Sequence, residues 1–130
     1  MKVSGSTAYG LLAVGYIAQN QQKGLVLSHD IANHYKIPLE YLFKIMQHLV
    51  RVNVLTSKRG PRGGFSLGRS PKKITLLEII EAVEGPLTCD LMLSDHAPRD
   101  KFATRATKTS DRAFTQARNV LKAVKLADLI

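Results

Sequence analysis

Apolar residues recur along most of this chain at helical spacing, which predicts a mainly α-helical protein. A first helix is expected from about Thr7 to Asn20, and Ser28 is expected to cap a second, short helix. Pro38 suits the first position of a third helix. The inward face of that third helix repeats at i, i+3, i+4 and i+7: Leu42, Ile45, Met46 and Leu49.

A small β-hairpin is predicted directly after the third helix. Two short segments with strand character, 53–57 and 65–68, flank Lys58–Gly64, a run of three cations, three glycines and a proline. Residues 25–27 can form a further, very short strand. Two short helices joined by a tight turn and followed by a basic hairpin predict a winged helix-turn-helix.

The second part of the chain is predicted to hold two more helices. Thr75 and Glu78 form a capping box that opens a fourth helix, and Gly85-Pro86 ends it. The apolar stripe of this helix is Leu76, Ile79, Ile80 and Val83. Residues 88–108 show no clear period and are expected to form a loop with at most one helical turn.

A last helix is expected to begin near Ser110. Its apolar residues form a narrow seam: Ala113, Phe114, Ala117, Val120, Leu121 and Val124. A narrow seam at this place fits burial against a second copy of the chain, so we expect a homodimer. The alternative is that the last helix folds back on the first.

The formal net charge of +9 is confined to the first part of the chain. Residues 1–73 hold 11 lysines and arginines and two acidic residues, whereas residues 74–130 hold eight of each. This asymmetry fits a module that binds a polyanion, and double-stranded DNA is the expected partner. No basic amphipathic helix with a Trp or Phe face favours a membrane surface. We therefore expect a DNA-binding winged helix-turn-helix domain over 1–86, then a loop and dimerisation helix over 87–130.

Composition limits the remaining classes. The 130 residues are 45% hydrophobic, enough for one folded domain with an appended element. Cys89 is the only cysteine, which excludes a disulfide within the chain and fits a reducing cytoplasm. No apolar run is long enough to span a bilayer, and the first residues lack the core of a signal peptide. A cytoplasmic protein without membrane contact is expected.

The outer face of the third helix is the candidate base-reading surface, together with Arg51 at its end: Leu39, Glu40, Phe43, Lys44 and Gln47. In a major groove, Lys44 can donate to guanine, Gln47 can pair with adenine and Glu40 can accept from cytosine. Phe43 can cover a thymine methyl group. It can equally be an ordinary exposed aromatic residue, or one tucked under the wing.

The sequence shows little sign of a metal site or of an enzyme active site. The four histidines show no metal-ligand spacing, and no second cysteine completes a zinc set. A weak metal or redox site at Cys89 and His96 is an alternative reading. No nucleophile–base set, phosphate loop or paired carboxylates are present, so an enzyme is not expected. A winged helix that binds protein or RNA is a further alternative.

Five stretches together resemble the bacterial Rrf2 family of winged helix-turn-helix transcriptional regulators, which includes IscR, NsrR and CymR: Tyr9–Ala13, Ile37–Leu42, Arg59–Leu67, Ile74–Leu76 and Ala82–Pro86. The resemblance implies a homodimer with crossed C-terminal helices that binds a palindromic operator, most often as a repressor. It also implies that the wing meets the minor groove through Arg59, Gly60, Pro61 and Arg62. The charges of the hairpin themselves suggest that Lys58, Arg59 and Arg62 follow phosphates or enter the adjacent minor groove.

Three departures from the family pattern matter. Cluster-binding members have three cysteines after the fourth helix and some have an acidic ligand in the first, where this chain has only Cys89 and Ala8. No iron–sulfur cluster is therefore expected; a thiol sensor, an unknown small-molecule effector or no sensor are the alternatives. Ser6-Thr7-Ala8 replaces a Lys-Gly-Arg turn, which removes two phosphate contacts. Phe43-Lys44 replaces a Glu-Gln pair, so the operator should differ.

Overall fold

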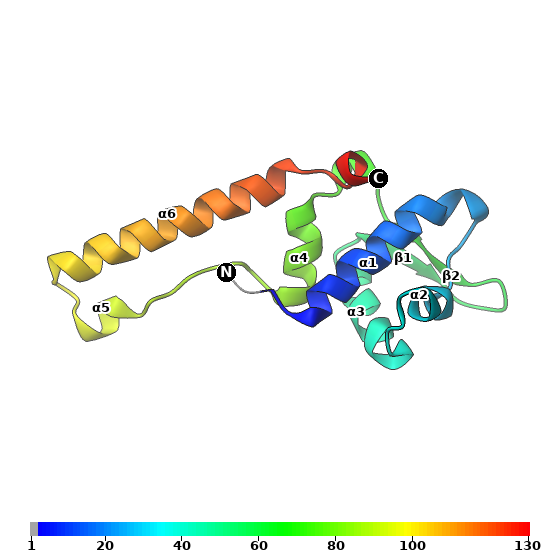
Figure 1. Cartoon of the computed structure of the whole chain (residues 1–130), viewed down its shortest axis with the longest axis horizontal. Helices are drawn as coiled ribbons and strands as arrows, with labels where there is room; N and C mark the ends of the chain where they lie inside the picture. Colours follow the sequence, from blue (N-terminus) through cyan, green and yellow to red (C-terminus); the bar gives the residue numbers. More distant parts are fainter. Residues whose placement is uncertain (1–2) are drawn as a thin grey trace.

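The computed structural model describes residues 3–130 and shows a helical body from which one long helix projects (Figure 1). Three helices precede the hairpin: α1 (Gly5–Asn20), α2 (Ser28–Tyr35) and α3 (Leu39–Arg51). The hairpin consists of β1 (Leu55–Lys58) and β2 (Gly64–Leu67). Three helices follow it: α4 (Leu76–Glu84), α5 (Leu93–His96) and α6 (Lys101–Ala123). The predicted fold class is confirmed.

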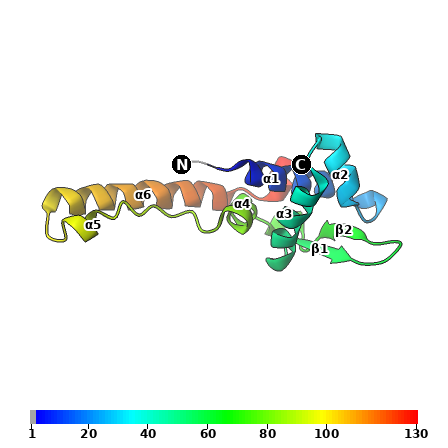
Figure 2. The same cartoon turned by 90° about the horizontal axis from the view of Figure 1, so that it is seen from below.

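The core lies where α1 packs against α3 and α4. All four inward residues predicted for α3 are buried, as are Ala13, Val14 and Ile17 of α1. Because α3 turns its apolar side to α1, its opposite side is left facing outward, away from the body (Figure 2).

The hairpin is antiparallel, with register from Leu55↔Leu67 to Lys58↔Gly64. Val26 pairs with Phe65 as an isolated bridge: the Val26 N–H donates to Phe65 O at 2.9 Å, and the Phe65 N–H donates to Val26 O at 2.7 Å. The predicted strand at 25–27 is thus reduced to one bridging residue, which ties the wing to the segment before α2.

Two predicted helix starts differ from the structure by one residue. Ser28 is the first residue of α2 and not its cap; Leu27 precedes the helix, and no side-chain cap bond forms. Pro38 precedes α3, which begins at Leu39. In both cases the preceding residue is still extended, and helix ends are the least determined part of a sequence pattern.

The capping box of α4 is confirmed: the Glu78 N–H donates to Thr75 Oγ1 at 3.1 Å, and the Thr75 N–H donates to Glu78 Oε2 at 2.8 Å. The predicted stripe is only partly right, because Leu77 is buried while Leu76 and Val83 are half-buried. The physical reason is that α4 is covered on two sides. One side joins the main core, and the other forms a second cluster of Leu77, Ile80 and Leu87 with Leu121 of α6.

The last helix is longer than predicted, beginning at Lys101 and not near Ser110. The Asp100 carboxylate caps it by accepting the Ala103 N–H at 3.0 Å. The first turns are mostly polar residues and alanines, which give no apolar period, so this cap was the available signal. The C-terminal end of α6 packs on α4, whereas its N-terminal half projects away from the body (Figures 1 and 2). α5 is a single helical turn, as expected for 88–108, but residues 101–108 of this predicted loop are helical because they belong to α6.

After α6 the chain returns to the body. The Leu76 N–H donates to Val124 O at 2.9 Å, and the Leu126 N–H donates to Ile74 O at 2.8 Å. Leu126 is buried in the main core. Within residues 3–130, no helix combines the length and the apolar character needed to cross a membrane.

Candidate nucleic-acid interface

The predicted base-reading residues lie together on the outer face of α3. Leu39, Glu40, Phe43 and Lys44 are exposed, and Gln47 is half-buried. Leu39, Phe43 and Gln47 follow one another at four-residue spacing and form one ridge, with Glu40 and Lys44 on a second ridge beside it. The N-terminal half of α3 therefore offers both apolar and polar groups to a partner.

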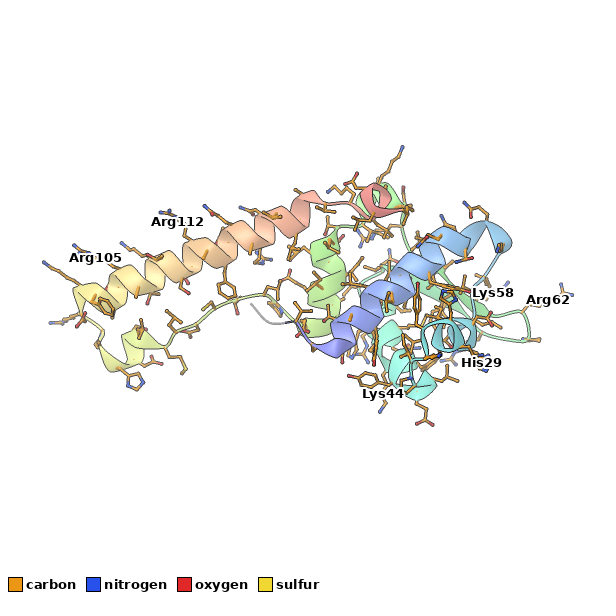
Figure 3. The ribbon with its side chains drawn as sticks, in the orientation of Figure 1. His29, Lys44, Lys58, Arg62, Arg105 and Arg112 are labelled. Carbon is orange, nitrogen blue, oxygen red and sulfur yellow. The ribbon has the colours of Figure 1, made fainter. Side chains whose placement is uncertain are left out.

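The five predicted wing residues, Lys58 to Arg62, are all exposed. The tip closes when the Gly63 N–H donates to Gly60 O at 2.9 Å. Gly60 has a φ of 107°, and a Cβ on Gly63 would lie 2.2 Å from the Lys58 carbonyl oxygen. This tight turn requires glycine at both places, and Figure 3 shows Arg62 at its outer end.

The wing and α3 enclose a groove of about 540 Å³. Its predicted members are Phe43, Gln47, Lys58, Arg59, Gly60 and Pro61. A second hollow of about 410 Å³ adjoins it, lined by Ser28, Leu39, Glu40, Phe43 and Lys44. Arg62 lines neither hollow. Phe43 and Ser28 line both, so the two hollows form one continuous face.

Sequence reasoning missed part of this face. Leu27 and Ser28, at the start of α2, and Ser57 and Phe65, on the wing strands, also line the groove. The signal for Ser57 and Phe65 was the hairpin register, which places them opposite one another. Leu27 gave no signal, because an apolar residue before a short helix is expected to be buried, yet it is 50% exposed.

Phe43 is both exposed and supported by the wing. Its ring meets the Phe65 ring edge-to-face, with centroids 6.2 Å apart and planes at 77°. Phe65 is buried, whereas Phe43 remains 45% exposed. One side of the Phe43 ring therefore packs against the wing, while the other side remains open to a partner.

Among residues 3–130, the cations of this face form no ion pair. In the part of the chain that the structure describes, the ion pairs are Arg69–Glu78 at 3.0 Å and Arg118–Glu81 at 3.1 Å. Arg62 points away from the body at the tip of the wing, and Arg105 and Arg112 lie toward the other end of the molecule, on α6 (Figure 3). A cluster of unneutralised cations in an open groove attracts a polyanion.

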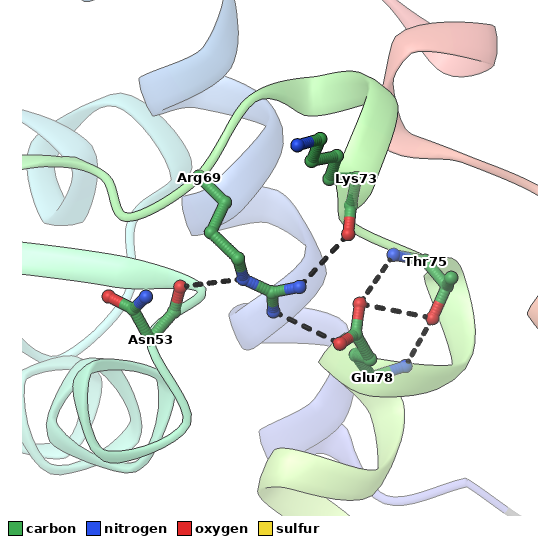
Figure 4. Close-up of polar contacts among 5 residues, drawn as sticks. All are labelled: Asn53, Arg69, Lys73, Thr75 and Glu78. Carbon is green, nitrogen blue, oxygen red and sulfur yellow. Dashed lines mark hydrogen bonds and ion pairs between the residues drawn. The ribbon is translucent and has the colours of Figure 1, made fainter.

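Arg69 fastens the base of the wing to α4 (Figure 4). Its guanidinium donates to Asn53 O at 3.2 Å and to Lys73 O at 2.9 Å, and it pairs with Glu78. Burial raises the pKa of Glu78, but the hydrogen bond from the Thr75 backbone and the Arg69 charge outweigh this and lower it below its ordinary value. The wing is thus anchored at its base and free at its tip.

The N-terminal residues that depart from the family pattern have a structural role. Thr7 is fully buried, and its hydroxyl donates to Glu84 Oε1 at 2.7 Å. The Ser4 N–H donates to the same oxygen. The hydrogen bonds from Ser4 and Thr7 lower the pKa of Glu84 below its ordinary value. This segment joins α1 to α4, and the Ser6 and Tyr41 hydroxyls join it to α3.

Cys89 is half-buried, and Ser110 Oγ donates to its Sγ at 3.1 Å. Among residues 3–130, no group of three or more His, Cys, Asp and Glu side chains is placed to hold a metal ion. One thiol does not fit a cluster that needs several thiolate ligands. The expectation that this chain has no iron–sulfur cluster stays a prediction.

The predicted dimer seam is divided by the fold. Val120 is 66% exposed, whereas Phe114, Ala117, Leu121 and Val124 are half-buried. Leu121 packs within its own chain, against the second cluster on α4. An outer stripe shares Ala113 and Val120 with the predicted seam and extends it toward the start of α6 at alternating spacings of four and three residues: Phe102, Ala106, Thr109, Ala113, Gln116 and Val120. Phe102, at its start, is 80% exposed.

Several known proteins similar to this chain are described as transcriptional regulators. A protein of Aquifex aeolicus, an HTH-type transcriptional regulator, is 44% identical over 81 residues, which are 62% of this chain and 56% of that protein. BadM of Rhodopseudomonas palustris is 35% identical over 131 residues, covering all of this chain and 81% of BadM. CymR of Bacillus subtilis is 32% identical over 98 residues, covering 75% of this chain and 71% of CymR.

Comparison of the fold with solved structures points to the same group of transcriptional regulators. The structure of CymR, described as the global cysteine regulator of B. subtilis, aligns with a TM-score of 0.84 at 29% identity, over 99% of this chain and 95% of that one. The Rrf2 family profile, described as an iron-dependent transcriptional regulator, matches residues 3–130. These relatives and this fold are those of regulators and not of enzymes. The chain belongs to the Rrf2 family of DNA-binding transcriptional regulators.

Proposed function

We propose that this chain is a cytoplasmic, homodimeric repressor that binds a palindromic operator through α3 and the wing. The observation that supports this most is the meeting of two surfaces at one groove: the outer ridge of α3 and the unpaired cations of the wing. Direct readout needs a helix that can enter the major groove, and affinity needs cations beside it. This face offers both.

The roles follow from the positions of the groups. Lys44 donates to O6 or N7 of a guanine, Gln47 pairs with an adenine, and Glu40 accepts from a cytosine amine. The wing cations, Lys58, Arg59 and Arg62, bind phosphates or enter the adjacent minor groove, which the narrow glycine-rich tip allows.

The dimer is proposed to form through the outer stripe of α6. Phe102 and Val120 are large apolar residues that remain 80% and 66% exposed, and mostly small residues lie between them. Large apolar residues at the two ends of a heptad-spaced stripe, with mostly small side chains between them, fit a helix that packs on an antiparallel or crossed partner helix. A twofold axis there gives two recognition helices and hence an inverted-repeat operator.

Selection from a random duplex library tests this function. The protein is expected to enrich an inverted repeat whose half-site spacing is close to one helical turn or a multiple of it. A Lys44→Ala variant should select a sequence changed at one position of each half-site. Enrichment of a single, unrepeated half-site would contradict the dimer, and no enrichment at all would favour a module that binds protein or RNA.

A further inference from the structure

The outer face of α3 is apolar at its centre. Leu39 and Phe43, one turn apart, are 41% and 45% exposed, and Leu27, across from them, is 50% exposed. Single exposed apolar side chains are common on surfaces, but here three of them border one concave face. A helix that only held phosphates would have no use for them.

Phe43 separates the two hollows of this face. On one side it lines the groove together with Gln47 and Lys58. On the other side it lines the second hollow together with Leu39 and Lys44. Each hollow therefore combines an apolar wall with a cation at its edge. This combination suits a ligand that has an apolar group beside hydrogen-bond acceptors and phosphates.

The Phe43 ring is supported on one side by the wing. It rests edge-to-face on Phe65, which is buried and joined to Val26 by two backbone hydrogen bonds. A ring supported on one side and open on the other can pack against a methyl group of the partner, and such a contact is lost when the methyl group is absent.

The one apolar group on base edges in the major groove is the C5-methyl of thymine. We infer that Phe43 and Leu39 read pyrimidine C5-methyl groups in each operator half-site, next to the guanine contacted by Lys44. This inference rests on the proposed DNA-binding function. Thymine and 5-methylcytosine share this methyl group, so both satisfy the same contact.

The test uses the operator obtained by selection and replaces each thymine in turn by deoxyuridine, which removes only the methyl group. One or two positions in each half-site are expected to lose about fourfold in affinity, equivalent to about 0.8 kcal/mol for one buried methyl-sized group. With the Phe43→Ala variant, the replacement of thymine by deoxyuridine at one or more of these positions is expected to leave the affinity unchanged. Lys44→Ala, the matched control, should weaken binding but keep the methyl effect.

A second experiment tests whether 5-methylcytosine can supply the same methyl group as thymine. At a sensitive position, a T·A pair is replaced by C·G and by 5-methylcytosine·G, and the methylated form is expected to bind more tightly than the unmethylated one. Phe43→Leu, which keeps an apolar side chain, is expected to retain part of the sensitivity.

The outcomes separate the two levels of the proposal. A clear selected operator with no loss at any deoxyuridine position overturns the methyl inference and leaves DNA binding standing. An unchanged methyl effect in Phe43→Ala also overturns it. Failure to select any sequence overturns the DNA-binding function itself.

Discussion

The two halves of the molecule use their charges differently. In the first half, Lys58 and Arg59 of the wing line the groove and Lys44 of α3 lines the adjoining hollow, and within residues 3–130 neither ion pair involves them. In the second half, Glu78 and Glu81 of α4 pair with Arg69 and Arg118. Charges paired inside the chain hold structure together, whereas unpaired charges in a concave face serve a partner. Within residues 3–130, Arg105 and Arg112 of the second half are also outside both ion pairs, but they line neither hollow. The place of a charge, and not its pairing alone, therefore separates the two halves.

The largest effect on operator affinity is expected at the proposed dimer contact on α6. Val120→Glu places a charge at the large apolar residue that ends the proposed dimer stripe and should give a monomer, since a desolvated carboxylate has no partner there. Operator affinity should then fall by about 100-fold or more, because the two half-sites are no longer bound as one unit. Molar mass by light scattering and operator binding measure both consequences.

Asn119→Glu is the matched control, because its neighbouring position on α6 is exposed and lies outside the stripe. It should remain a dimer with nearly normal affinity. A Val120→Glu protein that kept the wild-type mass and affinity would show that α6 does not form the dimer.

A smaller effect is expected at the wing tip. In Gly63→Ala the new Cβ would lie 2.2 Å from the Lys58 carbonyl, so the turn must open and displace the cations on either side of it. DNA affinity should fall by about tenfold, as expected for the loss of several ordered phosphate contacts. Gly5→Ala, where a Cβ meets nothing within 4 Å, is the control.

Circular dichroism separates binding from folding in the Gly63→Ala experiment. The helical signal and its thermal midpoint should change little, since the tip lies outside the core. A large drop in the thermal midpoint together with unchanged DNA affinity would mean that the tip stabilises the fold and does not bind DNA.

The smallest effect is expected at the Arg69–Glu78 pair, which joins the two halves, and it concerns stability and not DNA binding. Glu78→Gln removes the charge that pairs with Arg69 and should lower the free energy of unfolding by about 1 kcal/mol at neutral pH, because the pair is partly exposed. The folded-state pKa of Glu78 is lowered, so its contribution is present above the ordinary glutamate pKa of about 4.3 and is lost as the pH falls through the folded value.

Urea unfolding across this range measures the effect of Glu78→Gln. The stability difference between wild type and variant should shrink as the solution is acidified below about pH 4.3. Glu40→Gln, on the exposed face of α3, should show no comparable difference. A gap that widened in acid would contradict the role of the Arg69–Glu78 pair.

The sequence predicted the first half better than the second, for physical reasons. The inward residues of α3 and the presence of a hairpin after it follow from local periodicity and turn chemistry, and both were right, although the strands lie at Leu55–Lys58 and Gly64–Leu67 and not at 53–57 and 65–68. The start of α6 was wrong because its first turns are polar and depend on the Asp100 cap. The two-sided burial of α4 and the contact of Phe43 with Phe65 join segments far apart in the chain, which periodicity cannot predict.

The central claim is that the unpaired cations of the wing bind DNA and those of α6 do not. Lys58→Ala/Arg62→Ala and Arg105→Ala/Arg112→Ala remove the same charge from opposite ends of the molecule (Figure 3). The deciding measurement is the slope of log affinity against log salt for one operator duplex. The wing pair should lower the magnitude of the slope by about 2 while the α6 pair leaves it nearly unchanged. Equal changes for both pairs would mean that net charge alone, and not this groove, determines binding.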